Sequence, residues 1–182
     1  MQVKERVFRV SADSFFQANI NQAANMVDQV LKLAGDLSGK TVLDAYCGVG
    51  LFSAFLAGQA NRLIGIEVSE SSCNDFAVNM DEFDNVELYI DQVENVLPAL
   101  DLKPDIVVLD PPRAGLDARV VSALSKAKPK QIIYVSCDPA TLARDIKRFL
   151  QSGYELKSVT PFDQFPQTYH IETVVLMSKV SA

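Results

Sequence analysis

The sequence predicts an α/β protein whose mostly parallel β-sheet is covered by helices on both faces. From Gly35 onward, short apolar runs typical of buried strands alternate with segments whose apolar residues recur every three or four positions, as along a helix. No linker, repeat or low-complexity segment interrupts this alternation. The last two strands have no room for a helix between them, so we expect them to pair antiparallel.

Seven strands are expected at about 41–45, 62–68, 86–90, 105–110, 131–136, 154–162 and 171–179, with helices at about 49–59, 70–82, 93–100, 117–127 and 139–151. Ahead of them, residues 1–10 can form an extended arm. A helical pattern follows and ends at Gly35, and its apolar face consists of Ala23, Val27, Val30, Leu31 and Ala34. Because 182 residues suffice for one well-buried α/β domain, we expect residues 1–35 to pack on the domain formed by residues 36–182.

Composition disfavours several classes of protein. The three cysteines form no C-x-x-C pair and there is one histidine, so the sequence indicates no disulfide framework, iron–sulfur cluster, zinc site or metal-dependent hydrolase. This cysteine usage fits a reducing cytosol, and no apolar run resembles a signal peptide or a membrane span. The net charge of −6 means that nucleic-acid contacts must come from a local basic patch or a partner domain. We therefore expect a cytoplasmic protein without a metal.

The most informative stretch is residues 136–145, Ser-Cys-Asp-Pro-Ala-Thr-Leu-Ala-Arg-Asp, which follows an expected buried strand. Pro139 suits the first turn of a helix, and Asp138 can be its N-cap. Cys137 then lies at a carboxyl strand end, where open α/β sheets bind ligands, and beside a helix N-terminus, whose dipole favours a thiolate. A lone cysteine is more often a small core residue, but this position favours a nucleophile.

A second motif, residues 41–50, runs from a strand through a glycine-bearing turn toward a helix. Gly48 and Gly50 let the backbone approach a ligand, although the third glycine of a dinucleotide-binding motif is absent. Asp44 precedes the turn, and Glu67 ends the next strand, where an acid can bind ribose hydroxyls. S-adenosylmethionine carries such a ribose without phosphates, and the turn resembles the Asp-x-x-x-Gly-x-Gly turn of its methyltransferases. We favour cofactor binding over a structural tight turn.

The strand that ends at Asp110 is followed by two prolines, which restrict the loop, and by Arg113. Methyltransferases that act on amino groups carry an aromatic residue after Asp-Pro-Pro, so Arg113 disfavours an amine substrate. After the third strand, Asp91 and Gln92 fall where such enzymes contact adenine, although a surface turn explains these residues nearly as well.

The last strand begins near Glu172. If it lies antiparallel beside the strand at 131–136, its start neighbours the end of that strand, and Glu172 meets Cys137 at one edge of the cleft. His170, the only histidine, is the other candidate partner of the cysteine, and we prefer Glu172. A solvated strand end is the alternative interpretation of Glu172.

Five motifs resemble the successive signatures of the RNA uracil-5-methyltransferase family, whose members form 5-methyluridine in transfer and ribosomal RNA. They are Phe-Phe-Gln-Ala-Asn at 15–19, Asp-Ala-Tyr-Cys-Gly-Val-Gly at 44–50, Asp-Pro-Pro-Arg-Ala-Gly at 110–115, residues 136–145, and Phe-Pro-Gln-Thr-Tyr-His-Ile-Glu-Thr-Val at 165–174. The strand order is similar to the plan of Rossmann-like methyltransferases, in which the seventh strand inserts antiparallel between the fifth and sixth.

This resemblance implies an S-adenosylmethionine-dependent RNA methyltransferase that forms 5-methyluridine through a covalent bond between a cysteine and C6 of uracil. Carried over by position, Cys137 is the nucleophile and Glu172 is the base that removes the C5 proton. Arg113 and Arg144 position RNA or brace loops, and the residues alone do not choose between these roles. The resemblance assigns to the cofactor and base pocket Gln17, Tyr46, Gly48, Glu67, Gln92 and Asp110.

The sequence departs from the family at Asp138, where members usually have Asn, and an acid there can raise the thiol pKa. Members also usually carry an N-terminal OB-like RNA-binding domain, which we expect to be absent from this chain. Two alternatives therefore stay open. One is a cytosine-5 or other base methyltransferase on the same fold, and the other is a cofactor-binding module that is inactive without its RNA-binding domain.

Overall fold

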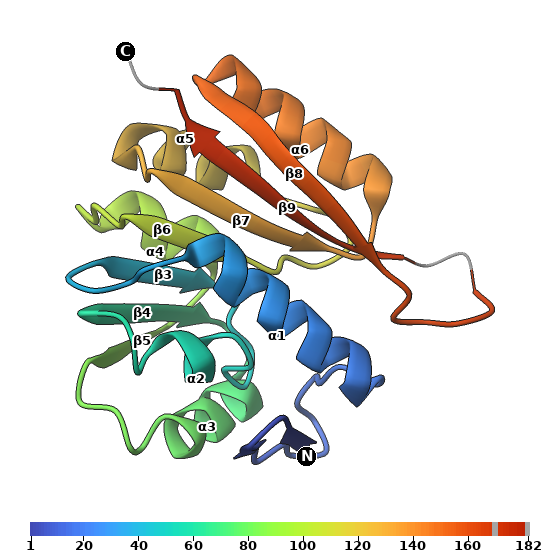
Figure 1. Ribbon diagram of the computed structural model, residues 1–182. Coiled ribbons are helices and arrows are strands. Elements are labelled where there is room, and N and C mark those ends of the chain that lie inside the picture. Colours follow the sequence, from blue (N-terminus) through green and yellow to red (C-terminus); the bar gives the residue numbers. More distant parts are fainter. Residues whose placement is uncertain (169–170, 181–182) are drawn as a thin grey trace.

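The computed structural model describes residues 1–168 and 171–180, and its centre is a seven-stranded sheet with the strand order β5-β4-β3-β6-β7-β9-β8 (Figure 1). All neighbouring pairs are parallel except the two pairs made by β9. The seventh strand thus inserts antiparallel between the fifth and sixth, as expected. The strands are β3 (Thr41–Ala45), β4 (Arg62–Glu67), β5 (Val86–Ile90), β6 (Ile106–Leu109), β7 (Gln131–Ser136), β8 (Tyr154–Phe162) and β9 (Glu172–Lys179).

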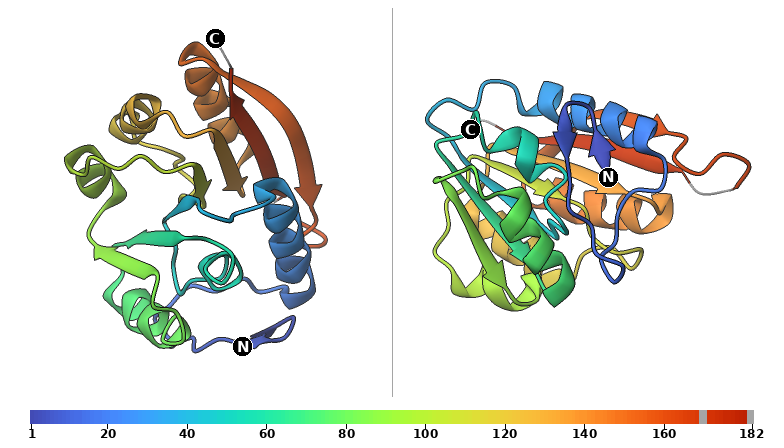
Figure 2. Two further views of the ribbon diagram at one scale, coloured as in Figure 1. Left: turned by 60° about the vertical axis from the view of Figure 1, so that its left-hand side comes forward. Right: turned by 90° about the horizontal axis from the view of Figure 1, so that it is seen from below.

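Helices cover both faces of this sheet, which confirms the expected architecture (Figures 1 and 2). Helices α1 (Ile20–Ala34), α2 (Ser53–Leu56) and α3 (Glu70–Asn79) cover one face, and α4 (Val93–Ala99), α5 (Ala118–Ala127) and α6 (Pro139–Gln151) cover the other. Successive strand residues point to opposite faces, so Val108 packs with the first layer and Leu109 with the second. This explains why the central strands are predominantly apolar.

Two helix ends follow the predicted local rules. The Asp138 carboxylate caps α6 by accepting hydrogen bonds from the backbone N–H groups of Ala140 and Thr141, and Pro139 opens the first turn. Gly35 ends α1 with a φ of 64°, a conformation that glycine adopts without a steric penalty. The start of α6, directly after Cys137, was therefore readable from the sequence.

The helix expected at 49–59 is shorter than predicted, because α2 is a single turn. The chain before it is held in a loop by Gly48 and Gly50, with φ values of 55° and 91°. A Cβ on Gly50 would lie 3.0 Å from side-chain atoms of Phe76 and Met80, so the glycine also lets this loop pack closely on α3. Loop packing here replaces the first half of the expected helix.

The N-terminal arm is a small hairpin rather than a single extended segment. Its strands β1 (Gln2–Val3) and β2 (Arg6–Val7) pair antiparallel, and Lys4 occupies the turn with a φ of 53°. Val3 is fully buried in the core between the sheet and α1. The arm therefore contributes to the same hydrophobic core as the sheet.

A buried carboxylate joins the segment after the hairpin to α3. Asp75 accepts hydrogen bonds from the Ser11 N–H at 2.7 Å, the Ser11 hydroxyl at 2.8 Å and the Ser14 hydroxyl at 2.7 Å. Arg9 pairs with the same carboxylate at 3.0 Å. These bonds hold the pKa of Asp75 below its usual value despite burial, and they hold residues 9–14 against α3.

We expect Asp75→Ala to destabilise the protein by about 2–4 kcal/mol, because it leaves several donors without their charged acceptor. Cleavage by a protease should also begin within residues 1–15 in this variant. Urea unfolding and mass spectrometry of the fragments measure both effects. Asp81→Ala, which removes an exposed carboxylate just after α3, is the matched control, and an equal loss of stability in both variants would contradict the anchoring role of Asp75.

Candidate active site

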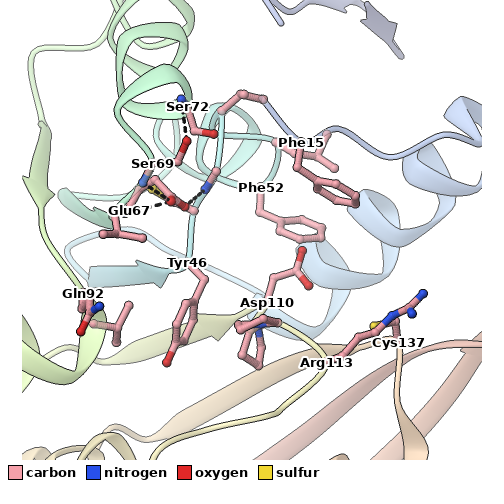
Figure 3. Close-up of a pocket in the computed structure, with 18 of the residues that line it drawn as sticks. Phe15, Tyr46, Phe52, Glu67, Ser69, Ser72, Gln92, Asp110, Arg113 and Cys137 are labelled. Atoms are coloured by element: carbon pink, nitrogen blue, oxygen red, sulfur yellow. Dashed lines mark hydrogen bonds between the residues drawn. The ribbon is translucent and has the colours of Figure 1, made fainter. Parts of the chain in front are cut away.

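A cavity of about 890 Å³ opens along the carboxyl ends of the parallel strands (Figure 3). Parallel strands bring their carboxyl ends to one edge, so loops that are distant in sequence meet there. All eight site residues expected from the sequence line this cavity: Gln17, Tyr46, Gly48, Glu67, Gln92, Asp110, Cys137 and Glu172. His170, the other candidate partner of Cys137, lies outside the described residues.

One end of the cavity is organised by Glu67, the last residue of β4. One carboxylate oxygen accepts hydrogen bonds from the Val68 and Ser69 N–H groups at 2.8 Å, and the other accepts from the Gly48 N–H at 2.9 Å. The carboxylate therefore ties the loop after β3 to the loop after β4 (Figure 3). A carboxylate has about four acceptor sites, so Glu67 keeps capacity for a ligand hydroxyl.

Tyr46 and Gln92 stand beside this end of the cavity. Tyr46 has a φ of 65°, which is uncommon for a non-glycine residue, and its hydroxyl donates to Glu94 at 3.1 Å. Burial and the Glu94 charge raise the pKa of Tyr46. Gln92 is the N-cap residue of α4, and its side chain makes no capping bond. Both residues lie in loops that follow strands, and both line the cavity (Figure 3).

A fully buried carboxylate lies behind the glycine turn. Asp44 accepts a hydrogen bond from the Ser53 hydroxyl at 2.6 Å, whereas its other oxygen has no partner among the described residues. Burial raises the pKa of Asp44 to about 7, against the lowering effect of Ser53. The turn thus encloses a carboxyl group that titrates near neutral pH.

Cys137 and Glu172 lie at the other end of the cavity. In the antiparallel pair of β7 with β9, Ser136 stands opposite Thr173, so the next residues in this register are Cys137 and Glu172. Both side chains line the cavity. The structure therefore brings the two residues together, as the strand order predicted.

Arg113 extends from the loop after β6 to the Cys137 sulfur, as Figure 3 shows. Burial and the Glu172 charge raise the pKa of the Cys137 thiol, and a hydrogen bond from Arg113 opposes them. The helix N-terminus was expected to favour the thiolate, but the net effect of the surroundings is a raised pKa. Arg113 thus lowers the pKa of this thiol, and burial and Glu172 outweigh its effect.

The carboxyl groups around Cys137 also have raised pKa values. Burial raises the pKa of Glu172 to about 7, and the Arg113 charge opposes this rise. Burial, Glu172 and Asp44 raise the pKa of Asp110 well above its usual value. The cavity therefore concentrates carboxyl groups in a low-dielectric environment, where a bound cation would stabilise their charged forms.

Sequence reasoning missed several residues that line the cavity. They are Phe52, Ser69, Ser72, Glu94 and Arg119. Ser69 had a local signal, because it follows Glu67 directly and caps α3. Phe52 had none, since its position depends on the loop that replaces the first half of the expected helix.

Within residues 1–168 and 171–180, no helix is long and apolar enough to cross a membrane. Over the same residues, no three His, Cys, Asp or Glu side chains are grouped to hold a metal ion.

The model of the family described as tRNA (Uracil-5-)-methyltransferase matches residues 1–180. An uncharacterized RNA methyltransferase of Enterococcus faecalis is 44% identical over 177 residues, which are 94% of this chain and 39% of that protein. One from Halalkalibacterium halodurans is 41% identical over 175 residues, or 93% of this chain and 38% of its own length. The chain thus spans about two fifths of the curated relatives that it matches.

The fold also matches solved structures. The tRNA (uracil-54, C5)-methyltransferase of Pyrococcus abyssi, solved with S-adenosyl-L-homocysteine, is 36% identical with a TM-score of 0.79, and the match covers 91% of this chain and 40% of that one. A putative RNA methyltransferase from Pyrococcus horikoshii is 20% identical with a TM-score of 0.69, over 89% of this chain and 85% of its own. The second likeness concerns the fold alone.

We expect Glu172→Gln to stabilise the protein at pH 8 and not at pH 4. The unfolded chain releases this proton near pH 4.5, whereas the folded protein keeps it to about pH 7. The native state consequently loses stability as the pH rises between these values. The expected gain is about 1–3 kcal/mol at pH 8. Urea unfolding at both pH values measures it, with exposed Glu5→Gln as the control, and a gain that does not depend on pH would argue against the raised pKa.

Proposed function

We propose that this chain, which belongs to the tRNA (uracil-5-)-methyltransferase family, transfers a methyl group from S-adenosylmethionine to C5 of uridine in RNA. The observation that carries this proposal is that Cys137, Glu172 and the Glu67 loops share one cavity. A nucleophile, a base and a ribose acceptor are the groups that such a reaction needs. The first two lie at one end of the cavity, and the third lies at the other.

The residues present fit S-adenosylmethionine. Glu67 retains acceptor capacity for the ribose hydroxyls, and Gln92 stands nearby for the adenine. Asp110 lines the cavity, and its charged form would be stabilised by the positive charge that the sulfonium and amino groups of this cofactor carry. When bound, the cofactor supplies an electrophilic methyl group. We also assign Gln17, Tyr46 and Gly48 to this pocket.

Cys137 is the proposed nucleophile. C5 of uracil is a poor nucleophile, and it becomes one when a thiolate adds to C6 and the C5–C6 π electrons are delocalised toward C5 and O4. Arg113 stabilises the thiolate that starts this step, and we assign the polar edge of the base to Asp110 or Gln17, which both line the cavity. The target base must leave the stack, because these atoms are not accessible within a duplex.

Glu172 is the proposed base. After methylation of C5, its carboxylate takes the C5 proton, the released electron pair restores the C5–C6 double bond, and the Cys137 thiolate leaves C6. A carboxylate with a pKa of about 7 is well matched to this task at neutral pH, because it is both available and basic enough to accept a proton.

The proposed substrate is transfer or ribosomal RNA in the cytoplasm. Arg113 and Arg119 line the cavity and can contact RNA there. The chain is acidic, with a net charge of −6, so the remaining phosphate contacts require another source of positive charge. The relatives extend beyond the matched region, and a separate RNA-binding domain is the source that we propose. In this scheme residues 1–35 belong to the same domain as residues 36–182.

We expect Glu67→Gln to weaken S-adenosylmethionine binding by about 10–100-fold, since hydrogen bonds to a charged acceptor contribute about 1.5–3 kcal/mol. Isothermal titration calorimetry measures the affinity without any RNA. Glu70→Gln removes a carboxylate three residues further along the chain and should bind as the wild type does. Unchanged affinity in Glu67→Gln would remove Glu67 from the cofactor site.

RNA that contains 5-fluorouridine tests the catalytic proposal directly. Fluorine at C5 cannot leave as a proton, so the reaction should stop with Cys137 covalently bound to C6. We expect a denaturation-resistant protein–RNA adduct that forms only with S-adenosylmethionine and disappears in Cys137→Ala. Transfer RNA and ribosomal RNA fragments, tested in parallel, distinguish the two substrates.

Cys73→Ala is the matched control for this experiment, because Cys73 is a buried cysteine of α3. It should form the adduct at the wild-type rate. An adduct or a methylated product in Cys137→Ala would contradict the mechanism. If wild-type protein binds the cofactor but forms no adduct, the domain is a cofactor-binding module that needs an RNA-binding domain to act.

A further inference from the structure

The loop that carries Arg113 is bound to α6 through its backbone. The Thr141 hydroxyl donates to the Arg113 carbonyl at 3.1 Å, and the Arg144 guanidinium donates to the Ala114 carbonyl at 2.8 Å. Arg148, one turn later, donates to the Leu116 carbonyl at 3.2 Å. Three side chains of one helix therefore hold consecutive parts of this loop.

A fully buried carboxylate, Asp145, fixes these cations. It accepts from Arg144 at 3.0 Å and from Arg148 at 3.1 Å. It also accepts from the Leu116 N–H at 2.8 Å and from the Tyr134 hydroxyl at 3.0 Å. Asp145 thereby links α6, strand β7 and the Arg113 loop in one hydrogen-bond network.

The loop meets this network so closely that only glycine fits at position 115. Gly115 has a φ of 73°, and a Cβ there would lie 2.5 Å from both Arg144 Nη2 and Asp145 Oδ2. A side chain there would have to displace an Asp145 carboxylate that hydrogen bonds from four residues hold in place, and the φ value is itself unfavourable for other residues. The backbone of the loop at Gly115 therefore lies directly against the Arg144 guanidinium and the Asp145 carboxylate.

Helix α6 begins two residues after Cys137. The cysteine and the Arg113 loop are consequently both held relative to the first turns of the same helix. We propose that Arg144 and Thr141 are positioning residues, which hold the Arg113 guanidinium beside the Cys137 sulfur. This inference rests on the proposed nucleophilic role of Cys137, and it assigns to Arg144 the bracing of a loop rather than a contact with RNA.

The position of Arg113 matters because it acts on the thiol against several carboxyl groups. Burial, Glu172 from β9 and Asp110 at the start of the Arg113 loop raise the pKa of Cys137, and Arg113 lowers it. Asp138, on the helix side, directs its carboxylate to the N–H groups of α6. A small displacement of the guanidinium would leave the thiol facing acids alone, and the thiolate would form only at higher pH.

The test measures how fast iodoacetamide alkylates Cys137 between pH 5 and 10 in the cofactor-free protein, with mass spectrometry of the Cys137 peptide as the readout. Arg113→Met should raise the pH midpoint of alkylation, because the counter-charge is gone. Arg144→Met and Thr141→Val, which keep Arg113 but remove its support, should raise the midpoint by about 0.5–1 pH unit.

Arg62→Met is the matched control, since Arg62 pairs with Glu87 on the far strands of the sheet and its loss removes the same charge. Its midpoint should equal that of the wild type. Midpoints in Arg144→Met and Thr141→Val that equal the wild-type value would overturn the inference, and so would an unchanged midpoint in Arg113→Met. A loss of thermal stability alone would indicate a structural role only.

This experiment separates the inference from the proposed function, because alkylation needs neither RNA nor the cofactor. If the wild type forms the 5-fluorouridine adduct and the midpoints do not move, the function stands and the positioning role fails. If the midpoints move and no adduct forms, the positioning role stands and this domain does not act on RNA by itself.

Discussion

The antiparallel pairing of β7 with β9 is the constraint on which the candidate site depends. In a parallel sheet, only the carboxyl ends of the strands lie at the ligand-binding edge. Each parallel strand therefore contributes to a site the residues that follow it in the chain. Strand β9 runs the other way and offers its first residue, Glu172, beside the end of β7. The pairing therefore places an acid next to Cys137 without any loop to position it. Glu172 is the first residue of β9 and Cys137 directly follows the last residue of β7, so the backbone of two paired strands fixes where both residues lie.

Around Cys137, the charge of the Arg113 guanidinium opposes the effects of burial and of the neighbouring carboxyl groups. Burial pushes Asp44, Asp110 and Glu172 toward their neutral forms, and the same low dielectric disfavours a Cys137 thiolate. Arg113 opposes this effect at Cys137 and Glu172. Burial in this way raises the pKa of Glu172 to about 7. The hydrogen bonds from α6 to the Arg113 loop matter because they hold the loop that carries this cation.

Local chemistry explains what could be predicted from the sequence. The strands, the Gly35 end of α1, and the Asp138 and Pro139 start of α6 depend on neighbouring residues, and their prediction is confirmed. The first half of the helix expected at 49–59 was wrong, because its conformation depends on packing against α3 rather than on its own periodicity. The partners of Asp145 were equally unreadable, since a strand, a helix and a loop distant in sequence meet at that carboxylate.

The sequence by itself determined the α/β class, the strand order through its resemblance to a known plan, and eight of the residues that line the cavity. It could do so because strand–helix alternation and motifs at strand ends are local patterns that a parallel sheet converts into one site. Only the tertiary structure decided which charged groups surround Cys137 and which groups Arg144 binds. Burial and Coulomb interactions depend on distances between segments far apart in the chain, and a helix dipole inferred from sequence neighbours does not include them.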